Sequence, residues 1–306
     1  MYFTLPGHQV LQTIQIMTPM NSLNRQPLLP NDHGAFFVTG LPAFNDNYIW
    51  VLQAGIAEMG TLRMVVVDPG DAAPIIDACR RRGVMPDEVW LTHHHADHTG
   101  GVDALRAWVN DQGRDLMIYG PGQESMPGVT CPLQGGESWL LNAGVCVSVL
   151  ALPGHTRGHV GYFVEVLGRT VAPALFCGDV LFGLGCGRLF EGTAAQMAAS
   201  LEQIRALPPD TRIYCAHEYT ALNLPFALAV DPDNVALQAR AATIRQRRQA
   251  GEATVPLTLA EECATNPFLR CEEAALAQAA MLPEGVGANE VFARLRQMRD
   301  TFKAPQ

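Results

Sequence analysis

A strand-like segment that runs directly into a cluster of histidines constrains the fold of this chain more than any other feature of its sequence. The segment DEVWLT, residues 87–92, is followed at once by HHHADH at 93–98, which holds four histidines and an aspartate. In an extended chain His93 and His95 point the same way, since alternate side chains share a face. Imidazole and carboxylate groups fill an apolar core poorly, but zinc, iron and manganese all accept them as ligands. The cluster therefore predicts a metal site at the end of a strand.

Three further candidate ligands stand at the ends of strand-like segments much later in the chain. They are His155 in LPGHTRGH, Asp179 in LFCGD and His217 in YCAHE. A carboxylate can bridge two cations, and with a bridging aspartate the ligand count closes for two adjacent divalent ions. The first ion would take His93, His95, His155 and Asp179, and the second would take Asp97, His98, His217 and Asp179. We expect zinc first, with iron or manganese as alternatives. The competing interpretation is a hydrogen-bonded histidine network without metal.

Other polar residues near these motifs leave more than one interpretation open. His94 points away from its two neighbours in an extended chain, so we expect a structural or surface role for it. His159 either orients a ligand through a hydrogen bond or packs in the core. Asp68 in VVVDPGD either contacts a ligand or caps a turn. His8 and His33 precede the first regular segment and receive no role.

Two adjacent cations predict a hydrolytic reaction. Metal ions lower the pKa of bound water toward about 7, so a hydroxide that bridges them is available at neutral pH. The same cations polarise a carbonyl group, and we expect Asp179 and Asp97 to be the catalytic carboxylates. The nucleophile pattern GxSxG, the P-loop and the dinucleotide pattern GxGxxG are absent, and no cysteine stands in a convincing pairing with histidine.

The spacing of apolar residues predicts an α+β protein with two main parts. From residue 36 strand-like segments alternate with helical ones, and the polar clusters follow strands. From about residue 219 the spacing becomes helical almost throughout. Four prolines interrupt the first residues, which lack the charged start and apolar block of a signal peptide. We expect a loose N-terminal extension at 1–34, a catalytic domain at 35–218 and a helical domain at 219–306.

Composition narrows the classes of partner. Hydrophobic residues make up 48% and charged residues 17% of the 306 residues, which is typical of an ordered globular protein. The formal charge of −9 argues against nucleic acid, and no apolar run approaches the ~18 residues that cross a membrane. Eight scattered cysteines without a CxxC pair indicate reduced thiols. We therefore expect a cytoplasmic protein whose sequence demands no more than a monomer.

The motifs HHHADH, PGHTRGH, GD at 178–179 and AHEYT resemble the metal motifs of the metallo-β-lactamase superfamily. Further segments resemble the glyoxalase II, or hydroxyacylglutathione hydrolase, family within that superfamily. They are FNDNYIW at 44–50, DPGD at 68–71, GDVLFGLGCGRLFEGT at 178–193, TNPFLR at 265–270 and RQMRDTF at 296–302. The resemblance thus extends over nearly the whole chain.

The resemblance implies a four-layer αββα metallo-β-lactamase sandwich with a helical, substrate-binding C-terminal domain. It implies hydrolysis of S-D-lactoylglutathione, and of related 2-hydroxyacyl glutathione thioesters, to D-lactate and glutathione in methylglyoxal detoxification. The seven ligands above match the family's two-metal set. Glutathione recognition maps to Arg188, Phe190, Tyr219, Arg296 and Arg299. The family often has lysine in place of Arg188 and Arg299, and arginine keeps the charge. It often has tyrosine in place of Phe190, and without that hydroxyl we expect a changed affinity or selectivity for the tripeptide but unchanged chemistry.

Arg296 and Arg299 are three residues apart on an expected helix and therefore share a face. Arginine can hold a carboxylate through two parallel hydrogen bonds, and glutathione ends in a glycine carboxylate. The plain alternative is a pair of solvated surface arginines. If the pair binds glutathione, Arg296→Ala should raise KM more than it lowers kcat.

Two other activities on the same fold are alternatives. A glutathione persulfide dioxygenase with a single iron shares part of the motif and would not need Asp97, His98 and His217. Another dinuclear hydrolase, such as a nuclease or a lactamase, would act on a different substrate. The negative net charge and the C-terminal segment argue against both kinds of hydrolase. The number of metal ions per chain separates the dioxygenase from the thioester hydrolase.

Overall fold

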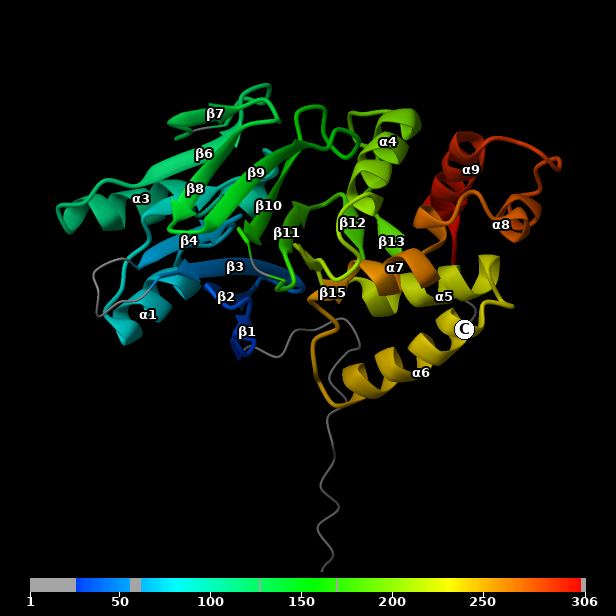
Figure 1. The fold of residues 1–306 in the computed structure, drawn as a ribbon, viewed down its shortest axis with the longest axis horizontal. Helices are drawn as coiled ribbons and strands as arrows, with labels where there is room; N and C mark the ends of the chain where they lie inside the picture. Colours follow the sequence, from blue (N-terminus) through cyan, green and yellow to red (C-terminus); the bar gives the residue numbers. More distant parts are fainter. Residues whose placement is uncertain (1–25, 56–61, 127, 169, 304–306) are drawn as a thin grey trace, which may run out of the picture.

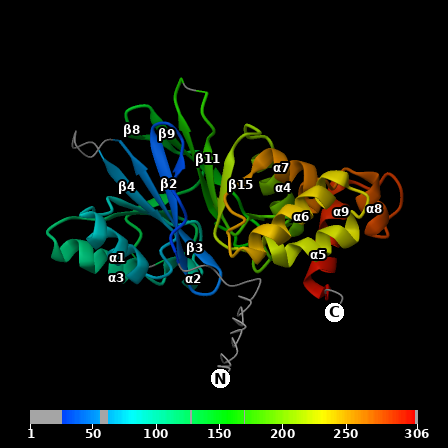
Figure 2. The same cartoon turned by 90° about the horizontal axis from the view of Figure 1, so that it is seen from below.

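The computed structural model of the protein describes residues 26–55, 62–126, 128–168 and 170–303. Two β-sheets pack face to face, and helices lie on their outer faces (Figure 1). Figure 2 shows the same molecule from below, with the C-terminal helices gathered beside the sheets. The α+β, four-layer arrangement expected from the sequence is confirmed.

The first sheet holds seven strands in chain order. Its first four strands pair antiparallel, and the fourth to seventh pair parallel. Two helices from the crossovers pack on its outer face, where Ile75 and Leu105 share a buried cluster with Val66 and Val89. The strands are β1 (Asn31–Asp32), β2 (Phe36–Ala43), β3 (Asn47–Ala54), β4 (Arg63–Val67), β5 (Glu88–Trp90), β6 (Met117–Pro121) and β7 (Cys131–Leu133), and the helices are α1 (Ala73–Arg82), α2 (Ala96–Thr99) and α3 (Val102–Asp111).

The second sheet has six strands, which also lie side by side in chain order. The crossover helix α4 (Ala194–Arg205) begins at a capping box formed by Thr193 and Gln196, and it joins the two strands that pair parallel. A short hairpin leaves the sheet just before this helix. In spatial order the strands are β15 (Leu257–Thr258), β14 (Arg212–Cys215), β11 (Ala174–Gly178), β10 (Val160–Val166), β9 (Val145–Ala151) and β8 (Ser138–Asn142), and the hairpin consists of β12 (Leu181–Phe182) and β13 (Gly185–Cys186).

The inner faces of the two sheets bury large aromatic side chains. Trp90 stacks on Tyr162 with ring centroids 4.9 Å apart, and Trp50 meets Tyr214 edge-on, also at 4.9 Å. In each pair the rings come from opposite sheets, and burial of a large apolar side chain stabilises a fold by roughly 1.5–3 kcal/mol. This packing holds the ends of β5, β11 and β14, from which candidate ligands extend.

The chain from residue 219 onward is mainly helical, as the apolar spacing predicted, but it also completes the second sheet. Between two of the helices the chain forms β15, which pairs with β14 at the sheet edge. The sequence predicted no strand here, because two residues are too few to show an alternating pattern. The helices are α5 (Thr220–Val230), α6 (Val235–Gln249), α7 (Leu259–Thr265), a 3-10 helix at Pro267–Leu269, α8 (Ala274–Ala279) and α9 (Ala288–Thr301).

Residues 1–25 of the expected N-terminal extension, His8 among them, lie outside the described residues. The end of that extension is ordered, since β1 pairs with β2 and His33 is buried. His33 Nδ1 donates to the carbonyl of Ala172 at 2.6 Å, so its Nε2 accepts from the Tyr214 hydroxyl at 2.7 Å. Burial lowers the pKa of His33 and keeps its ring neutral. His33 is thus a structural residue of the sandwich, a role that its sequence context did not indicate.

Every helix in the described ranges is too short or too polar to cross a membrane. All eight cysteines lie within the described residues, and none of them forms a disulfide bond. Burial raises the pKa of Cys177 and of Cys271 to about 12, so these thiols stay protonated. They behave as small apolar residues, as their sequence context predicted.

Candidate metal centre

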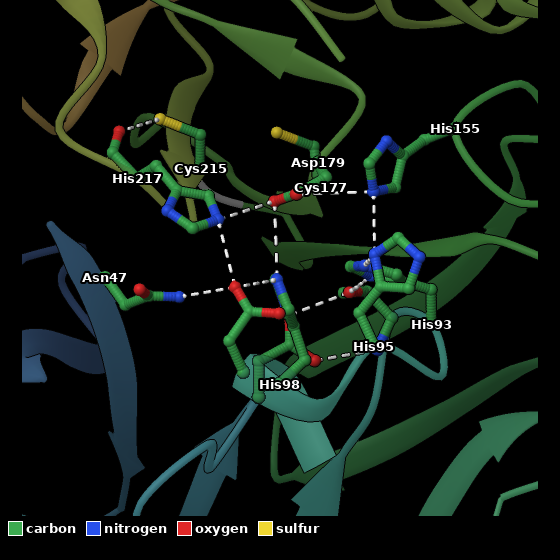
Figure 3. Close-up of polar contacts among 12 residues, drawn as sticks. Asn47, His93, His95, His98, His155, Cys177, Asp179, Cys215 and His217 are labelled. Atoms are coloured by element: carbon green, nitrogen blue, oxygen red, sulfur yellow. Dashed lines mark hydrogen bonds and ion pairs between the residues drawn. The ribbon is translucent and has the colours of Figure 1, made fainter. Parts of the chain in front are cut away.

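The seven sequence-predicted ligands extend from strand ends in both sheets and form one cluster. Figure 3 shows how His93, His95, His98, His155, Asp179 and His217 lie in it. Asp97 and His98 lie in the single turn of α2, whose first residue follows His95 directly. Because both sheets present these strand ends on the same side of the sandwich, ligands that are far apart in the chain converge. The first sheet supplies His93, His95, Asp97 and His98 after β5, and the second supplies His155 between β9 and β10, Asp179 after β11 and His217 after β14.

Three imidazoles form the first half of the cluster. His95 Nδ1 lies 3.0 Å from His93 Nε2 and 3.1 Å from His155 Nε2. A single proton can bridge only one pair of these nitrogens at a time, whereas a cation among them can accept all three lone pairs. These three side chains are the ones expected to hold the first ion.

Asp179 joins this triad to the second half of the cluster. Its Oδ2 lies 3.4 Å from His155 Nε2, and its Oδ1 lies 3.4 Å from His217 Nε2 and 3.5 Å from His98 Nε2. Asp97 Oδ2 lies 3.5 Å from His217 Nε2 and 3.6 Å from His98 Nε2. The carboxylate of Asp179 thus faces both groups of ligands, which is the arrangement that a bridging role requires.

Two atoms at the middle of the cluster show that it suits a divalent cation. His98 Nε2 and Asp179 Oδ1 are buried and have no hydrogen-bond partner among the described residues. A buried polar atom without a partner costs about 1–3 kcal/mol, and coordination to a cation removes that cost. The donor set of imidazole nitrogens and carboxylate oxygens therefore fits a site for divalent metal ions.

Carboxylates on the outer side of two imidazoles decide which nitrogen faces the cluster. His98 Nδ1 donates to Asp68 Oδ2 at 2.9 Å and His217 Nδ1 donates to Asp46 Oδ1 at 2.8 Å, so each Nε2 points inward. Asp68 also accepts from the backbone amide and the hydroxyl of Thr92, at 2.8 and 2.7 Å. Of the two interpretations of Asp68, the structure supports the one in which it contacts a candidate ligand.

Backbone groups hold His155 and His159. His155 Nδ1 donates to the carbonyl of Arg188 at 2.9 Å, which leaves its Nε2 for the cluster. His159 Nε2 accepts from the backbone amide of Asp179 at 3.2 Å, and its ring stacks on His93 with centroids 4.9 Å apart. His159 therefore both orients one candidate ligand and packs against another, so its two interpretations are compatible. The ring of His94 contacts the carboxylate of Glu124, in line with the structural or surface role expected for it.

The three imidazoles of the first half are neutral. Burial lowers the pKa of His93 well below its usual value, and the neighbouring histidines lower it further. Burial is also the main reason that the pKa values of His95 and His155 are lowered. A metal ion binds the neutral form of imidazole, so these rings need not lose a proton first.

The second half of the cluster is charged before a cation binds. Burial opposes ionisation of Asp179, but His217 and His98 hold its pKa well below its usual range. Burial also opposes protonation of His217, yet Asp179 and Asp46 raise its pKa to about 10. A cation that takes the place of the proton on His217 would meet the same two negative charges, so this half favours positive charge.

A pocket of about 470 Å³ opens beside Asp179 and His155. All five residues expected to bind glutathione lie in its wall. They come from the segment after β13, the start of α5 and the last turns of α9, and they are Arg188, Phe190, Tyr219, Arg296 and Arg299. The structure therefore brings the candidate substrate residues and the candidate metal ligands to one cavity.

Aromatic rings stand where the pocket meets the cluster. Tyr219 stacks on His217 with ring centroids 4.5 Å apart, and Phe190 lies edge-on to His155 at 5.2 Å. Phe190 is 61% exposed, so its ring is available to a bound molecule. Tyr219 is partly buried, because Phe182 packs edge-on against it at 5.1 Å.

The two arginines of α9 differ in environment, although the sequence predicted a shared role. Arg296 is only 5% exposed and donates to the Cys186 carbonyl and to Asp300 Oδ1, both at 2.9 Å. Arg299 is half-buried, and its guanidinium approaches Asn223 Oδ1 at 3.2 Å. Arg296 therefore braces the β12–β13 hairpin, whereas Arg299 presents more of its charge to the pocket.

Two polar residues at the β2–β3 turn belong to the site without having been predicted. Asn47 Nδ2 donates to Asp97 Oδ2 at 3.0 Å, and Asp46 contacts His217 as described above. Their segment, FNDNYIW, contributed to the family resemblance but was assigned no role. Asparagine and aspartate between two strand-like segments are also an ordinary turn signal, which concealed their contact with the ligands.

Comparison with known proteins points to one family. Residues 218–302 match the family model described as hydroxyacylglutathione hydrolase C-terminus, and residues 55–113 match that of the metallo-beta-lactamase superfamily. The hydroxyacylglutathione hydrolases of Dechloromonas aromatica and Shewanella baltica are 50% and 45% identical over 283 and 278 residues, and each match covers 87% of this chain and 99% of the relative. A metallo-beta-lactamase from Staphylococcus aureus superposes with a TM-score of 0.54 at 21% identity, over 90% of this chain and 75% of that one.

Proposed function

The chain belongs to the hydroxyacylglutathione hydrolase, or glyoxalase II, family of the metallo-beta-lactamase superfamily, and we propose that the metal centre and its pocket form the active site for that hydrolysis. The substrates are S-D-lactoylglutathione and related 2-hydroxyacyl glutathione thioesters, and the products of the first are D-lactate and glutathione. One observation carries the proposal: the shared carboxylate Asp179 and three arginines line a single cavity. The cavity thus offers hydrolytic chemistry at one end and positive charge for a tripeptide at the other.

We propose that the cluster holds two divalent cations, with zinc expected first and iron or manganese as alternatives. The support is the donor set on either side of Asp179 and the two buried atoms that have no hydrogen-bond partner among the described residues. Bound there, the cations supply a water of lowered pKa and polarise the thioester carbonyl group. The residues that would hold them are His93, His95 and His155 on one side, Asp97, His98 and His217 on the other, and Asp179 between.

The chain's own side chains position the water and the acyl group. Asp179 and Asp97 can accept hydrogen bonds from the attacking water and orient its lone pair toward the thioester carbon. Tyr219 and Phe190 flank the acyl group and reduce its contact with solvent. Water adds to the acyl carbon, the carbon–sulfur bond breaks, and glutathione leaves as a thiolate that takes up a proton from solvent. A thiolate is a good leaving group, so no strong general acid is required.

Hydrolysis is tested by following the loss of thioester absorbance from S-D-lactoylglutathione while dissolved oxygen is recorded in the same cell. The proposal expects turnover without oxygen uptake and about two metal ions per chain. Oxygen uptake with glutathione persulfide and one iron per chain would establish the dioxygenase instead. If the metal-loaded protein turns over the thioester no faster than metal-free protein does, the assignment of this substrate is wrong.

Arg299→Ala is expected to raise KM for S-D-lactoylglutathione by at least about tenfold, with kcat changed by less than about twofold. A hydrogen bond to a charged group contributes about 1.5–3 kcal/mol. The bond expected here joins the Arg299 guanidinium to a carboxylate of glutathione, far from the reacting carbon. The variant therefore loses the same binding energy in the bound substrate and in the transition state. Such a uniform loss raises KM and leaves kcat nearly unchanged. Arg299→Lys keeps the charge and should stay within about threefold of the wild-type KM. A fall in kcat at unchanged KM, measured by steady-state kinetics, would contradict this role.

Arg296→Ala serves as the comparison for that variant. The sequence led us to expect a rise in KM that exceeds the fall in kcat, but Arg296 also holds the Cys186 carbonyl and Asp300. The structure therefore predicts a lower melting temperature together with the change in KM. A melting temperature equal to that of the wild type would restore the simpler expectation.

We also propose that residues 35–218 form the catalytic domain and residues 219–306 the substrate-binding domain, after the extension at 1–34. The support is the family model that begins at residue 218 and the place of two pocket arginines on α9. A monomeric, cytoplasmic enzyme whose partner is the glutathione thioester, with no nucleic acid or membrane, is part of the same proposal. Its eight reduced cysteines fit a reducing compartment.

A further inference from the structure

Glu124 is a buried carboxylate beside the metal centre that takes no part in the chemistry proposed above. It follows β6, and its side chain is only 3% exposed. Its Oε2 accepts hydrogen bonds from the backbone amide and from Nδ1 of His94, both at 2.8 Å. Its Oε1 accepts from the backbone amide of Gly158 at 2.9 Å and from the hydroxyl of Thr156. Four donors from two separate loops therefore converge on one side chain.

The groups that Glu124 contacts stand next to candidate ligands of the first cation. His94 lies between two of those ligands in the sequence, and Thr156 follows the third, His155. The carboxylate thus ties the loop after β5 to the loop between β9 and β10. The two loops are far apart along the chain, since His95 and His155 are separated by 60 residues.

Close packing against Gly158 also holds Glu124 in this place. A Cβ atom added to Gly158 would lie 2.6 Å from Glu124 Cγ and 3.2 Å from Gln123 Cβ. Only glycine therefore lets the loop that carries His155 approach Glu124 so closely. A side chain at residue 158 would force the loop and the carboxylate apart.

His94, Glu124 and Glu191 could also be interpreted as the ligands of a further cation. Hydrogen bonding argues against that interpretation, because both oxygens of Glu124 already accept from backbone amides and side chains. His94 Nε2 in turn faces Glu191 Oε1 at 3.2 Å. A cation would have to displace two amide donors from a buried carboxylate, which leaves those amides without partners.

We propose that Glu124 is a positioning residue that determines how closely His155 approaches His93 and His95, and hence how tightly the first cation is bound. The inference rests on the two-cation centre proposed above. Two ligands of the second cation, His98 and His217, are instead oriented by the carboxylates of Asp68 and Asp46. Loss of Glu124 should therefore weaken the binding of the first cation and leave the binding of the second unchanged.

The test measures the affinity of each cation by competition with a chelator, and follows Co²⁺ absorption spectra to tell the two positions apart. In Glu124→Gln an amide NH2 group replaces one of the two carboxylate oxygens and faces donors that need an acceptor. The affinity for the first cation should therefore fall about ten- to a hundredfold. Gly158→Ala displaces the carboxylate without removing its charge and should cause the same selective loss. The matched control is Glu137→Gln, whose carboxylate accepts from the amides of Gln134 and Gly135, at 2.6 and 2.8 Å, within its own turn.

The outcomes separate this inference from the function on which it rests. Wild-type affinities in Glu124→Gln would overturn the positioning role, and so would an equal loss of both cations or the same loss in Glu137→Gln. If Glu124→Gln does not fold, Gly158→Ala provides the same comparison. If the wild-type protein binds a single cation, the two-cation centre is wrong, and an unchanged affinity for that one cation in either variant overturns the role of Glu124.

Discussion

Removal of the bound cations is expected to abolish thioester hydrolysis and to lower the melting temperature by several degrees. Hydrolysis should stop because the cavity then holds no group that lowers the pKa of water at the acyl carbon. Stability should fall because His98 Nε2 and Asp179 Oδ1 are left buried without a hydrogen-bond partner among the described residues. A cation present at a thousand times its dissociation constant stabilises the folded state by about 4 kcal/mol, and that contribution is lost.

The experiment dialyses the protein against a strong chelator and verifies metal removal by elemental analysis. Turnover of S-D-lactoylglutathione and the thermal unfolding curve are then measured before and after each of Zn²⁺, Fe²⁺ and Mn²⁺ is added back. We expect at least one ion to restore both quantities together, and the most effective ion identifies the metal that this donor set prefers. Full turnover in protein shown to be free of metal would contradict a metal-dependent mechanism.

Asp179→Asn is expected to lower kcat/KM by more than about a hundredfold and to reduce the number of bound cations. Removing a group that merely orients a ligand costs about ten- to a hundredfold in affinity or activity, and Asp179 faces both halves of the cluster directly. Asparagine keeps the shape of the side chain but loses the charge that faces His217 and His98. The measurements are steady-state kinetics and metal content of the purified variant.

Two further aspartates provide graded comparisons for Asp179→Asn. Asp97 contacts only the second half of the cluster, so Asp97→Asn should retain one cation and lose less activity. Asp231 is also buried, but it pairs with Arg270 in the helical part at 3.3 Å, so Asp231→Asn should keep both cations. Two cations and near wild-type turnover in Asp179→Asn would show that the bridging carboxylate lies elsewhere.

The fold was largely predictable because its strands and helices carry strong local patterns. β5 ends just before the histidine cluster, and the C-terminal helices follow the apolar spacing from residue 219. β15 was missed because two residues show no periodicity, and its pairing with β14 is decided at a distance. His33 was missed for the same reason, since its partner Tyr214 lies 181 residues away.

The candidate site shows the same division between near and distant information. The residue types and the strand-end positions of all seven candidate ligands can be read along the chain, because a ligand is defined by its own chemistry and by the local pattern before it. The sequence does not show which nitrogen of His217 faces inward, because this depends on a hydrogen bond to Asp46, which lies 171 residues away.

The sequence alone was therefore sufficient to name the candidate donor set and the family resemblance, and that resemblance implied the order of the layers. The folded chain was needed to show that Arg296 is a buried brace while Arg299 faces the pocket, and that Glu124 joins two ligand-bearing loops. Both facts depend on burial and on contacts between residues that are distant in the chain. No local pattern encodes such contacts, because they arise only when the two sheets and the C-terminal helices pack together.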